Sequence, residues 1–250
     1  MSTTLVIQSH RQPLPLPLLT PCLASVRAWA DSRGFAYRFV DDALFDALPA
    51  DLRRRDDLAT VVKTDLARLH ALRGALDEGY DCAIWCDADC LCFAPDAFDV
   101  PDTDFALGRE VWIQTDAQRS DRLRAYVKVH NAFMLFRRDN SFLDFYLGAA
   151  TRLLRSLDGP CAPQFIGPKF LTAVHNIARC PVAESAGMLS PPVVADIVRG
   201  GGAALDLFRQ KAPQPVAMVN LCASLAAGDA AYGAVVDQAV ERLQGRGAAL

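Results

Sequence analysis

Apolar and polar residues follow one another along this chain in the blocks typical of an α/β protein. Short apolar runs of strand length alternate with longer segments whose apolar residues recur every three or four positions, as on one face of a helix. The runs predict strands at 3–7, 35–40, 82–86, 105–107, 127–136 and 215–221. The periodic segments predict helices at 20–33, 58–78, 140–157, 169–177 and 232–243.

Turn and capping residues give these elements their expected ends. Thr20, followed by Pro21, is expected to cap the first long helix, and Asp57 and Asp139 to cap two later ones. The pair at 41–42 is expected to cap a short helix at 43–48. The polar segment 112–124 is expected to be a mobile loop, and the glycines at 200–202 a turn.

Length and charge narrow the class of protein. The chain has 250 residues, of which 52% are hydrophobic, and a formal net charge of −3, which suits one domain with a full core. A nucleic-acid-binding protein would usually show a basic excess, so nucleic acid is not an expected partner. No apolar run reaches the length of a membrane span, and the first residues lack a signal-peptide pattern. We therefore expect a cytoplasmic protein, with peripheral membrane contact through a partner left open.

Two carboxylates follow the apolar run at 82–86. Asp87 and Asp89 stand at the carboxyl end of this predicted strand, where open α/β sheets bind ligands. One residue separates them, so in extended geometry both side chains point to the same side. Two hard oxygen ligands on one side suit Mg²⁺ or Mn²⁺ carrying a phosphate. The alternative is a polar turn in which the two aspartates cap backbone amides, and for an isolated D-x-D this alternative is the commoner one.

The long helix before this strand carries a second unusual acid. Asp65 lies in the middle of the apolar stripe of the helix predicted at 58–78, and a carboxylate there needs a partner or a ligand. Arg68, one turn later, is the natural partner. The pair is either a buried structural ion pair or part of the wall of a pocket.

Eight cysteines raise the question of zinc or disulfides. The four between residues 82 and 92 do not have the paired spacing of zinc ligands. Cys82, Ile84 and Cys86 fall on one face of a strand, as small core residues do. A zinc module stays a lesser alternative, and disulfides are not expected in a reducing compartment.

Four segments in order resemble the DXD-motif glycosyltransferases of the GT-A fold, most closely families 32, 8 and 34. They are KTDLAR at 63–68, the strand that ends in Asp87-Ala88-Asp89, HNAFM at 130–134 and GPKFLT at 167–172. Together with the first strand, the resemblance covers residues 3–178. The chain departs from family 32 in the spacing before the DXD motif, and it lacks the late histidine that often completes the metal site. Asn220 or Ser224 is the nearest substitute for that histidine.

The resemblance implies a single GT-A-like domain over 1–250, with a mixed, Rossmann-like sheet flanked by helices. Residues 1–100 would form the nucleotide-binding half and 101–250 the acceptor and sugar half. The implied protein is a metal-dependent glycosyltransferase that transfers a sugar, with retention, from a nucleotide-sugar donor to a glycan or glycolipid acceptor. A UDP-sugar is the favoured donor and a GDP-sugar the alternative.

The resemblance also suggests roles for individual residues. Asp87 and Asp89 are expected to bind Mn²⁺ or Mg²⁺. The expected donor-binding residues are Gln8, Asp65, Arg68, Asp87, His130, Asn131, Gly167 and Pro168. His130, a lone histidine in an apolar strand, is equally compatible with a core residue. Gln164 and Asp104 are possible nucleophiles, and nothing in the sequence selects either.

Two other functions stay open. One is a sugar nucleotidyltransferase, although such enzymes usually have a glycine-rich basic loop after the first strand and the segment 8–11 has no glycine. The other is a nucleotide-sugar-binding protein without turnover. This alternative stays open because the late histidine that often completes the metal site is missing.

Overall fold

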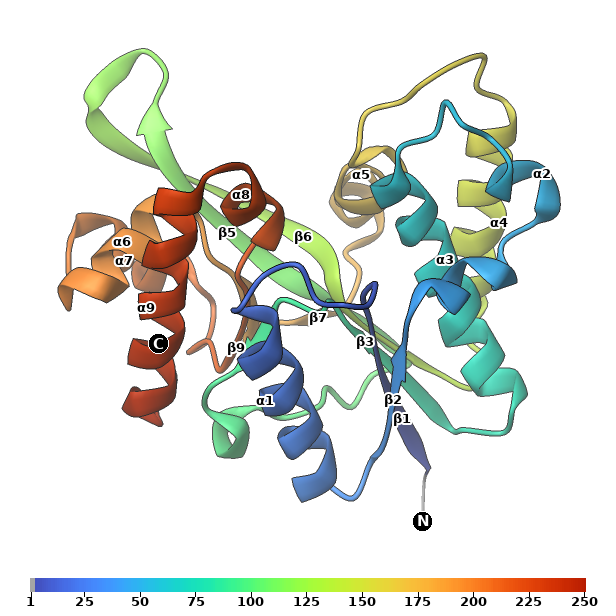
Figure 1. The fold of residues 1–250 in the computed structure, drawn as a ribbon, viewed down its shortest axis with the longest axis horizontal. Helices are drawn as coiled ribbons and strands as arrows, with labels where there is room; N and C mark the ends of the chain where they lie inside the picture. Colours follow the sequence, from blue (N-terminus) through green and yellow to red (C-terminus); the bar gives the residue numbers. More distant parts are fainter. Residues whose placement is uncertain (1–2) are drawn as a thin grey trace.

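A mixed sheet of six strands forms the centre of the protein, and helices cover both of its faces (Figure 1). The computed structural model describes residues 3–250, apart from the side chain of Ser120. The strand order is β2-β1-β3-β6-β5-β7, and β4, β9 and β8 form a second, smaller sheet. The strands are β1 (Thr4–Ser9), β2 (Ala36–Val40), β3 (Cys82–Cys86), β4 (Cys90–Cys92), β5 (Phe105–Asp116), β6 (Arg119–Arg137), β7 (Val182–Ala183), β8 (Ala186–Met188) and β9 (Met218–Asn220).

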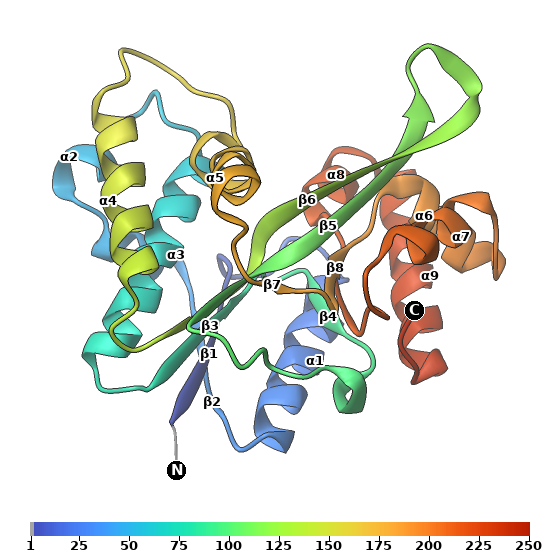
Figure 2. The same cartoon turned by 180° about the vertical axis from the view of Figure 1, so that it is seen from behind.

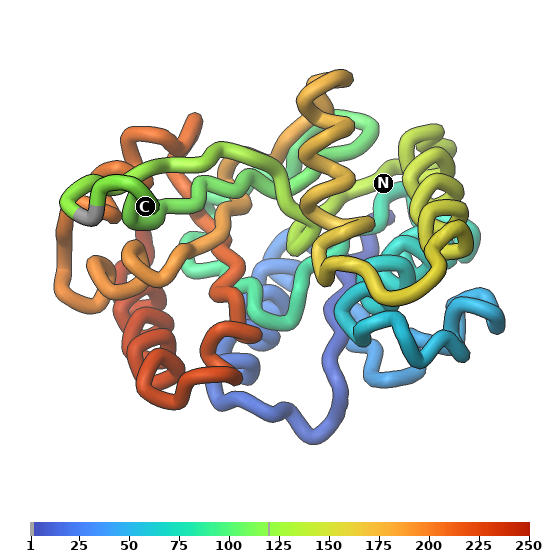
Figure 3. The backbone as a smooth tube through the Cα atoms, turned by 90° about the horizontal axis from the view of Figure 1, so that it is seen from above, coloured from blue at the N-terminus to red at the C-terminus, as the bar shows by residue number. Residues whose placement is uncertain are grey.

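The helices divide between the two faces of the large sheet. They are α1 (Leu19–Ser32), α2 (Ala50–Arg53), α3 (Thr60–Asp77), α4 (Ser141–Arg155), α5 (Phe170–Ala178), α6 (Pro191–Arg199), α7 (Ala203–Lys211), α8 (Ala223–Gly228) and α9 (Ala230–Arg246), with 3-10 turns at Asp42–Ala47 and Pro95–Ala97. One core contains buried residues of α1, α6, α7 and α9, and the other contains those of α3 and α4. Seen from behind and from above, the C-terminal helices and the pair α3 and α4 lie at opposite ends of the molecule (Figures 2 and 3). The predicted α/β fold with a mixed, helix-flanked sheet is confirmed.

Strand β3 is buried on both faces because its residues alternate between the two cores. Cys82, Ile84 and Cys86 pack in the core with α1, as predicted, while Ala83 and Trp85 pack in the core with α3. β3 runs parallel to β1 and antiparallel to β6. A strand covered on both sides reads as a continuous apolar run. The apolar run therefore ends with the strand at Cys86, and the polar Asp87 follows directly.

The prediction of a short strand at 105–107 and a loop at 112–124 was wrong. β5 and β6 form one long antiparallel ribbon that projects well beyond the rest of the sheet (Figure 1). The register shifts between Leu107 and Gly108, beside His130 of the opposite strand. A Cβ atom on Gly108 would lie 2.1 Å from the His130 ring, so only glycine fits there. The polar composition that suggested a loop belongs to the far end of the ribbon, where most residues from Gln114 to Arg124 are exposed.

Three predicted helix caps differ from the structure. The first helix begins at Leu19 and has no side-chain cap, so Thr20 lies inside it. The helix that carries Asp65 begins at Thr60, not after Asp57, whose carboxylate pairs with Arg55 instead. Asn140, not Asp139, caps α4. The prediction at 41–42 is confirmed, because Asp41 accepts a hydrogen bond from the Ala43 amide at 3.0 Å.

The region after residue 179 contains more regular structure than the sequence indicated. It forms β7, β8, α6 and α7, and the predicted strand at 215–221 is only the three residues of β9. The glycines at 200–202 do form the turn between α6 and α7. β9 pairs with β4, which brings Asn220 opposite Cys90, directly after the DXD motif. Among residues 3–250, no helix has the length and apolarity that a membrane crossing requires.

Candidate functional site

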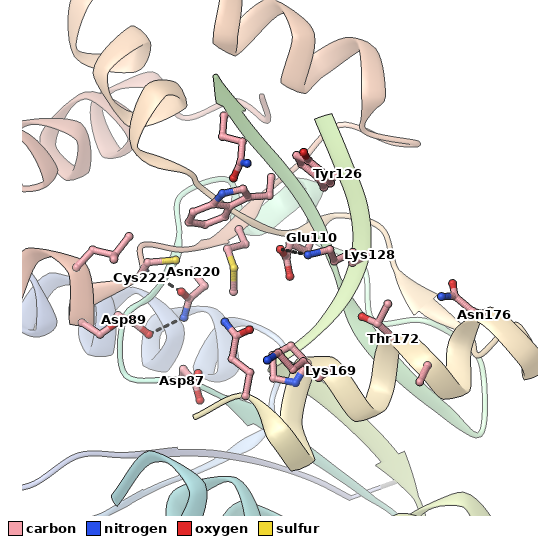
Figure 4. Close-up of a pocket in the computed structure, with 18 residues that line it drawn as sticks. Asp87, Asp89, Glu110, Tyr126, Lys128, Lys169, Thr172, Asn176, Asn220 and Cys222 are labelled. Carbon is pink, nitrogen blue, oxygen red and sulfur yellow. Dashed lines mark hydrogen bonds and ion pairs between the residues drawn. The ribbon is translucent and has the colours of Figure 1, made fainter. Parts of the chain in front are cut away.

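A cavity of about 900 Å³ opens at the carboxyl end of β3. Asp87 and Asp89 lie in its wall, and the other lining residues come from the β5–β6 ribbon, from α5 and the residues directly before it, from the end of β8 and from the region of β9 and α8 (Figure 4). Four segments that are far apart in the sequence thus meet at one end of β3. This is the place at which open α/β sheets bind ligands.

Asp87 is held by its side chain and by its backbone. Its Oδ1 accepts a hydrogen bond from the Trp85 indole at 2.7 Å and lies 3.1 Å from Nη1 of Arg68. Its amide donates to the Ala132 carbonyl at 2.8 Å, which ties the turn to β6. These contacts fix the carboxylate while the side chain stays partly exposed to the cavity.

Asp89 is held from the opposite side. Its Oδ1 accepts a hydrogen bond from Asn220 Nδ2 at 2.6 Å (Figure 4), and its Oδ2 accepts one from the Ala223 amide at 2.7 Å. Burial, and then the charge of Asp87, raise the pKa of Asp89 to about 6. Two carboxylates facing one cavity repel each other, and a bound cation would relieve that repulsion.

Asn220 is oriented by its second hydrogen bond. Its Oδ1 accepts from the Cys222 amide at 2.9 Å, so the amide nitrogen is the atom that faces Asp89. A nitrogen that carries two hydrogens cannot bind a metal. In this arrangement Asn220 positions Asp89 and does not face the cavity with its oxygen. Of the two residues expected to substitute for the late histidine, this leaves Ser224, which has a hydroxyl oxygen and lines the cavity.

Arg68 lies at the centre of a buried polar cluster behind Asp87. It contacts Asp65 Oδ1 at 3.1 Å and donates to the Asn131 carbonyl at 2.9 Å, and its guanidinium lies 5.3 Å from the centre of the Trp85 ring. The Asn131 amide donates to Asp65 Oδ1 at 2.8 Å. Burial raises the pKa of Asp65 to about 6, although Arg68 and Asn131 act in the opposite direction. The ion pair expected between Asp65 and Arg68 is present, and it reaches the cavity through Asp87.

Gly167 closes this cluster from the side of α5. A Cβ atom at Gly167 would lie 2.5 Å from Asp65 Oδ2 and 2.8 Å from the Asn131 amide nitrogen. Asp65 Oδ2 is buried and has no hydrogen-bond partner among the described residues. Pro168, the next residue, lines the cavity. Asp65, Asn131 and Gly167 therefore form a layer directly behind the cavity wall.

Gln8 and His130 are buried and their polar atoms are engaged within the protein. Gln8 donates to the Asp87 carbonyl at 3.0 Å and accepts from the Tyr37 hydroxyl at 3.1 Å. His130 Nδ1 accepts from the Ala132 amide, so the proton lies on Nε2, which is 3.2 Å from the Ala186 carbonyl. Burial lowers the pKa of His130 to about 4, so the ring is neutral. In this conformation both side chains support the turn and β6, and neither lines the cavity.

The two candidate nucleophiles lie in different places. Gln164 lines the cavity. Asp104 precedes β5, and its carbonyl accepts from the Arg137 amide, opposite the start of β3 at Cys82. Four residues of strand separate that position from the end of β3, which is about 13 Å. Asp104 is therefore at the wrong end of the sheet, and that expectation is corrected.

The chemistry of the acids suits a hard cation. Mg²⁺ and Mn²⁺ are bound through one or two carboxylates, with water and phosphate oxygens as the remaining ligands. Asp87 and Asp89 provide such a pair. Both contacts of the Asp87 carboxylate fall on Oδ1, so its Oδ2 accepts no hydrogen bond among the described residues, and each oxygen of Asp89 accepts one hydrogen bond and retains a lone pair. Within residues 3–250 no group of three histidine, cysteine or acidic residues is placed to hold a metal, which a structural zinc site would need. Cys82, Cys86, Cys90 and Cys92 are all buried with free thiols.

Sequence reasoning missed one whole wall of the cavity. Five side chains of the β5–β6 ribbon line it: Glu110, Trp112, Gln114, Tyr126 and Lys128. The signal was present, because positions 110, 112 and 114 alternate with the apolar Val111 and Ile113, which are buried. Strict alternation of this kind predicts a strand with one polar face.

The fold is similar to that of solved glycosyltransferase structures. Over 93% of this chain and 98% of the other, the protein is similar to a glycosyltransferase involved in the glycosylation of the major capsid of PBCV-1, with a TM-score of 0.50 and 10% sequence identity. The galactosyltransferase LgtC, in complex with donor and acceptor sugar analogs, is a weaker match, with a TM-score of 0.44 and 14% identity over 94% of this chain and 95% of that one. No family model matches the sequence, and no curated protein matches it.

The first of these matches extends over nearly the whole of both chains, so the likeness concerns the complete domain and not one βαβ unit. At this level of sequence identity it concerns the fold alone. The protein is a single α/β domain with the GT-A fold of glycosyltransferases.

Proposed function

We propose that this protein is a metal-dependent glycosyltransferase that uses a nucleotide-sugar donor. The observation that carries the proposal is the pair Asp87 and Asp89, which face one cavity at the carboxyl end of β3 in a domain with the fold of glycosyltransferases. A polar turn with two capping aspartates would need no cavity. Here Asp87 accepts a hydrogen bond from the Trp85 indole, and Asp89 accepts from Asn220 and from the Ala223 amide at the start of α8, 131 and 134 positions away, and both acids line the cavity.

Asp87 and Asp89 would hold the Mn²⁺ or Mg²⁺ ion. When bound, such a cation offsets the negative charge of the departing nucleoside diphosphate as a Lewis acid. The protein's own contribution is to fix the two carboxylates, through Trp85 and Arg68 on one side and Asn220 on the other.

The donor would lie along the end of β3, with residues 1–100 as the nucleotide-binding half. A UDP-sugar is the favoured donor and a GDP-sugar the alternative. Asp87 and Pro168, in the cavity wall, would contact the sugar. Asp65, Asn131 and Gly167, in the layer behind that wall, would hold these two residues in place. Transfer would proceed with retention, and Gln164 is the candidate for the group that faces the sugar. Residues 101–250 would receive a glycan or glycolipid acceptor in the cytoplasm.

The proposal is tested by thermal unfolding with UDP and with GDP, each with and without Mn²⁺. A ligand that binds only the native state raises the melting temperature. We expect a shift with one nucleotide that requires Mn²⁺ and that is lost in Asp89→Ala. An unchanged sugar transfer by Asp89→Ala at saturating Mn²⁺ would refute the metal mechanism.

A nucleotide-sugar-binding protein without turnover is the second candidate. It is favoured by the fact that both oxygens of Asp89 already accept hydrogen bonds and that Asn220 presents a nitrogen to it. Hydrolysis of a UDP-sugar in the absence of an acceptor separates the two functions, because a binding protein shows the Mn²⁺-dependent shift but no release of UDP.

A further inference from the structure

The wall that β5 and β6 contribute to the cavity is a ladder of paired side chains. Residues directly opposite each other in an antiparallel pair have side chains on the same face. The register places Glu110 opposite Lys128, Trp112 opposite Tyr126, and Gln114 opposite Arg124. Five of these six side chains line the cavity. The ribbon thus presents three facing pairs in sequence, here called rungs. Glu110 and Lys128 form the charged rung, Trp112 and Tyr126 the aromatic rung, and Gln114 and Arg124 the polar rung.

The ladder has an inner and an outer end. Lys128 is four residues before Ala132, whose carbonyl binds the Asp87 amide, so the rung of Glu110 and Lys128 is the one nearer the two aspartates. Glu110 lines the same cavity as Cys222, whose amide binds Asn220, the residue that donates to Asp89. From Glu110 to Gln114 the ladder spans four residues, or about 14 Å. This is longer than a single hexose ring.

The aromatic rung has one ring that is available for stacking. Arg124 and Lys128, two residues before and after Tyr126 on the same strand face, lie 5.1 and 5.8 Å from the centre of its ring. Trp112 is half-buried, and among the described residues no aromatic ring or cation stacks on it. A large aromatic surface on the wall of a cavity that also contains polar groups is a feature of ligand recognition.

The charged rung is suited to hydroxyl groups. The Glu110 side chain is 12% exposed, and Lys128 Nζ lies 3.9 Å from its Oε1, beyond normal hydrogen-bond distance (Figure 4). Its oxygens can therefore accept hydrogen bonds from a ligand, while Lys128 and Gln114 can donate them. A pyranose offers the matching surface, because one face of the ring carries C–H groups and its edge carries hydroxyls.

We propose that the ladder of Glu110, Trp112, Gln114, Tyr126 and Lys128 is an acceptor subsite for an oligosaccharide of at least two sugar units. A hydroxyl of the terminal unit lies by Glu110 and Lys128, facing Asp87 and Asp89, and the chain extends outward over Trp112 to Gln114. This inference rests on the proposed function and names its acceptor class. A free oligosaccharide and the glycan portion of a glycolipid share this chemistry.

Tryptophan fluorescence provides a direct test. The chain has three tryptophans, and Trp29 and Trp85 are 0% and 1% exposed, so quenching by acrylamide reports on Trp112. The probes are an array of immobilised glycans of one to six sugar units and, for the glycans bound there, the same glycan free and attached to a lipid. We expect binding from two units upward, with protection of Trp112 from acrylamide. Equal binding of the free and lipid-attached forms identifies the glycan as the recognised part, whereas binding of the lipid-attached form alone overturns the proposal.

Three variants make the test specific. Trp112→Ala should weaken glycan binding at least about tenfold, which corresponds to the loss of about 1.4 kcal/mol. Trp112→Phe keeps a ring and should retain more of the affinity. Val127→Ser is the matched control, because Val127 is 48% exposed on the same ribbon but does not line the cavity, and it should bind as the wild type does. Circular dichroism confirms that each variant is folded.

The outcomes separate this inference from the proposed function. A Mn²⁺-dependent shift with a nucleotide, together with no glycan binding by the wild type, overturns the acceptor subsite and leaves the glycosyltransferase standing. Glycan binding that is as strong in Trp112→Ala as in the wild type overturns the subsite as well. Glycan binding that is weakened in Trp112→Ala, retained in larger part in Trp112→Phe and unchanged in Val127→Ser supports it, whatever the nucleotide result.

Discussion

Asn220 donates a hydrogen bond to Asp89 over 2.6 Å, although 131 positions separate the two residues in the chain. The contact exists because β9 pairs with β4 and sets Asn220 opposite Cys90, next to the DXD turn. Asn220 is 4% exposed, and its own oxygen is fixed by the Cys222 amide. The second aspartate of the motif is thus oriented by the C-terminal part of the chain.

Replacing this asparagine should weaken metal binding. Groups that orient a metal ligand typically contribute 10–100-fold to affinity, so we expect Asn220→Ala to lower Mn²⁺ affinity by about that factor. Ser224→Ala is the comparison, because Ser224 lines the same cavity. Titration of free Mn²⁺ by electron paramagnetic resonance measures both. A larger loss in Ser224→Ala would identify the serine hydroxyl as a ligand.

Metal binding should depend on pH through Asp89. The pKa of Asp89 in the metal-free protein is raised from 3.8 to about 6, so a proton competes with the cation below that pH. We expect Mn²⁺ affinity to be constant above about pH 7 and to fall by about tenfold per pH unit below pH 6. Isothermal titration calorimetry between pH 5 and 8 tests this, and a constant affinity over that range would contradict it.

Removing Arg68 should destabilise the fold. The side chain is 5% exposed and contacts the carboxylates of Asp65 and Asp87, each at 3.1 Å. Arg68→Met leaves buried negative charge without a partner, which costs roughly 3–5 kcal/mol of unfolding free energy. Urea denaturation measures the loss. Arg155→Ala, which breaks an exposed ion pair with Asp51, is the control and should change the midpoint far less. Equal effects in the two variants would show that the buried cluster is not stabilising.

A methyl group at Gly167 should disturb the layer behind the cavity. The new Cβ atom of Gly167→Ala would lie 2.5 Å from Asp65 Oδ2, so the buried groups must shift, at about 1–3 kcal/mol. Nucleotide-sugar affinity, measured by calorimetry, should fall with it. Gly74→Ala in α3 is the matched control, because nothing lies within 4 Å of its Cβ position and alanine favours a helix by about 1 kcal/mol. A Gly167→Ala protein as stable as the wild type would show that the Gly167 segment can move away.

Local sequence patterns predicted the N-terminal half of the fold well. The strands at 82–86 and 35–40 and the helix around Asp65 came from periodicity alone, because each buries a continuous run or one clear stripe. Helix starts were less accurate, since a cap depends on single side chains: Asp57 pairs with Arg55 and Asn140 takes the place of Asp139. The ribbon of β5 and β6 was missed because its polar face is part of a cavity wall and its composition resembles that of a loop.

Within the candidate site, the sequence by itself determined the acids and their place directly after the buried strand. A buried strand that ends at Cys86 places Asp87 and Asp89 at the carboxyl end of the sheet. The extended geometry expected at 87–89 is absent, because Ala88 and Asp89 form a turn, and the direction of the Asp89 side chain is set by Asn220 and Ala223. The pair of Asp65 and Arg68 also followed from helical spacing, because residues three apart lie on one face.

Only the tertiary structure decided which other residues meet these acids. Asn220 reaches Asp89 through strand pairing, and Gly167 reaches Asp65 through the packing of the segment before α5. Gln8 and His130 face the interior, and Asp104 lies at the far end of the sheet, because strand direction and register fix which end and which face a residue occupies. Contacts between segments that are more than sixty residues apart depend on how the two cores pack, and no local pattern carries that information.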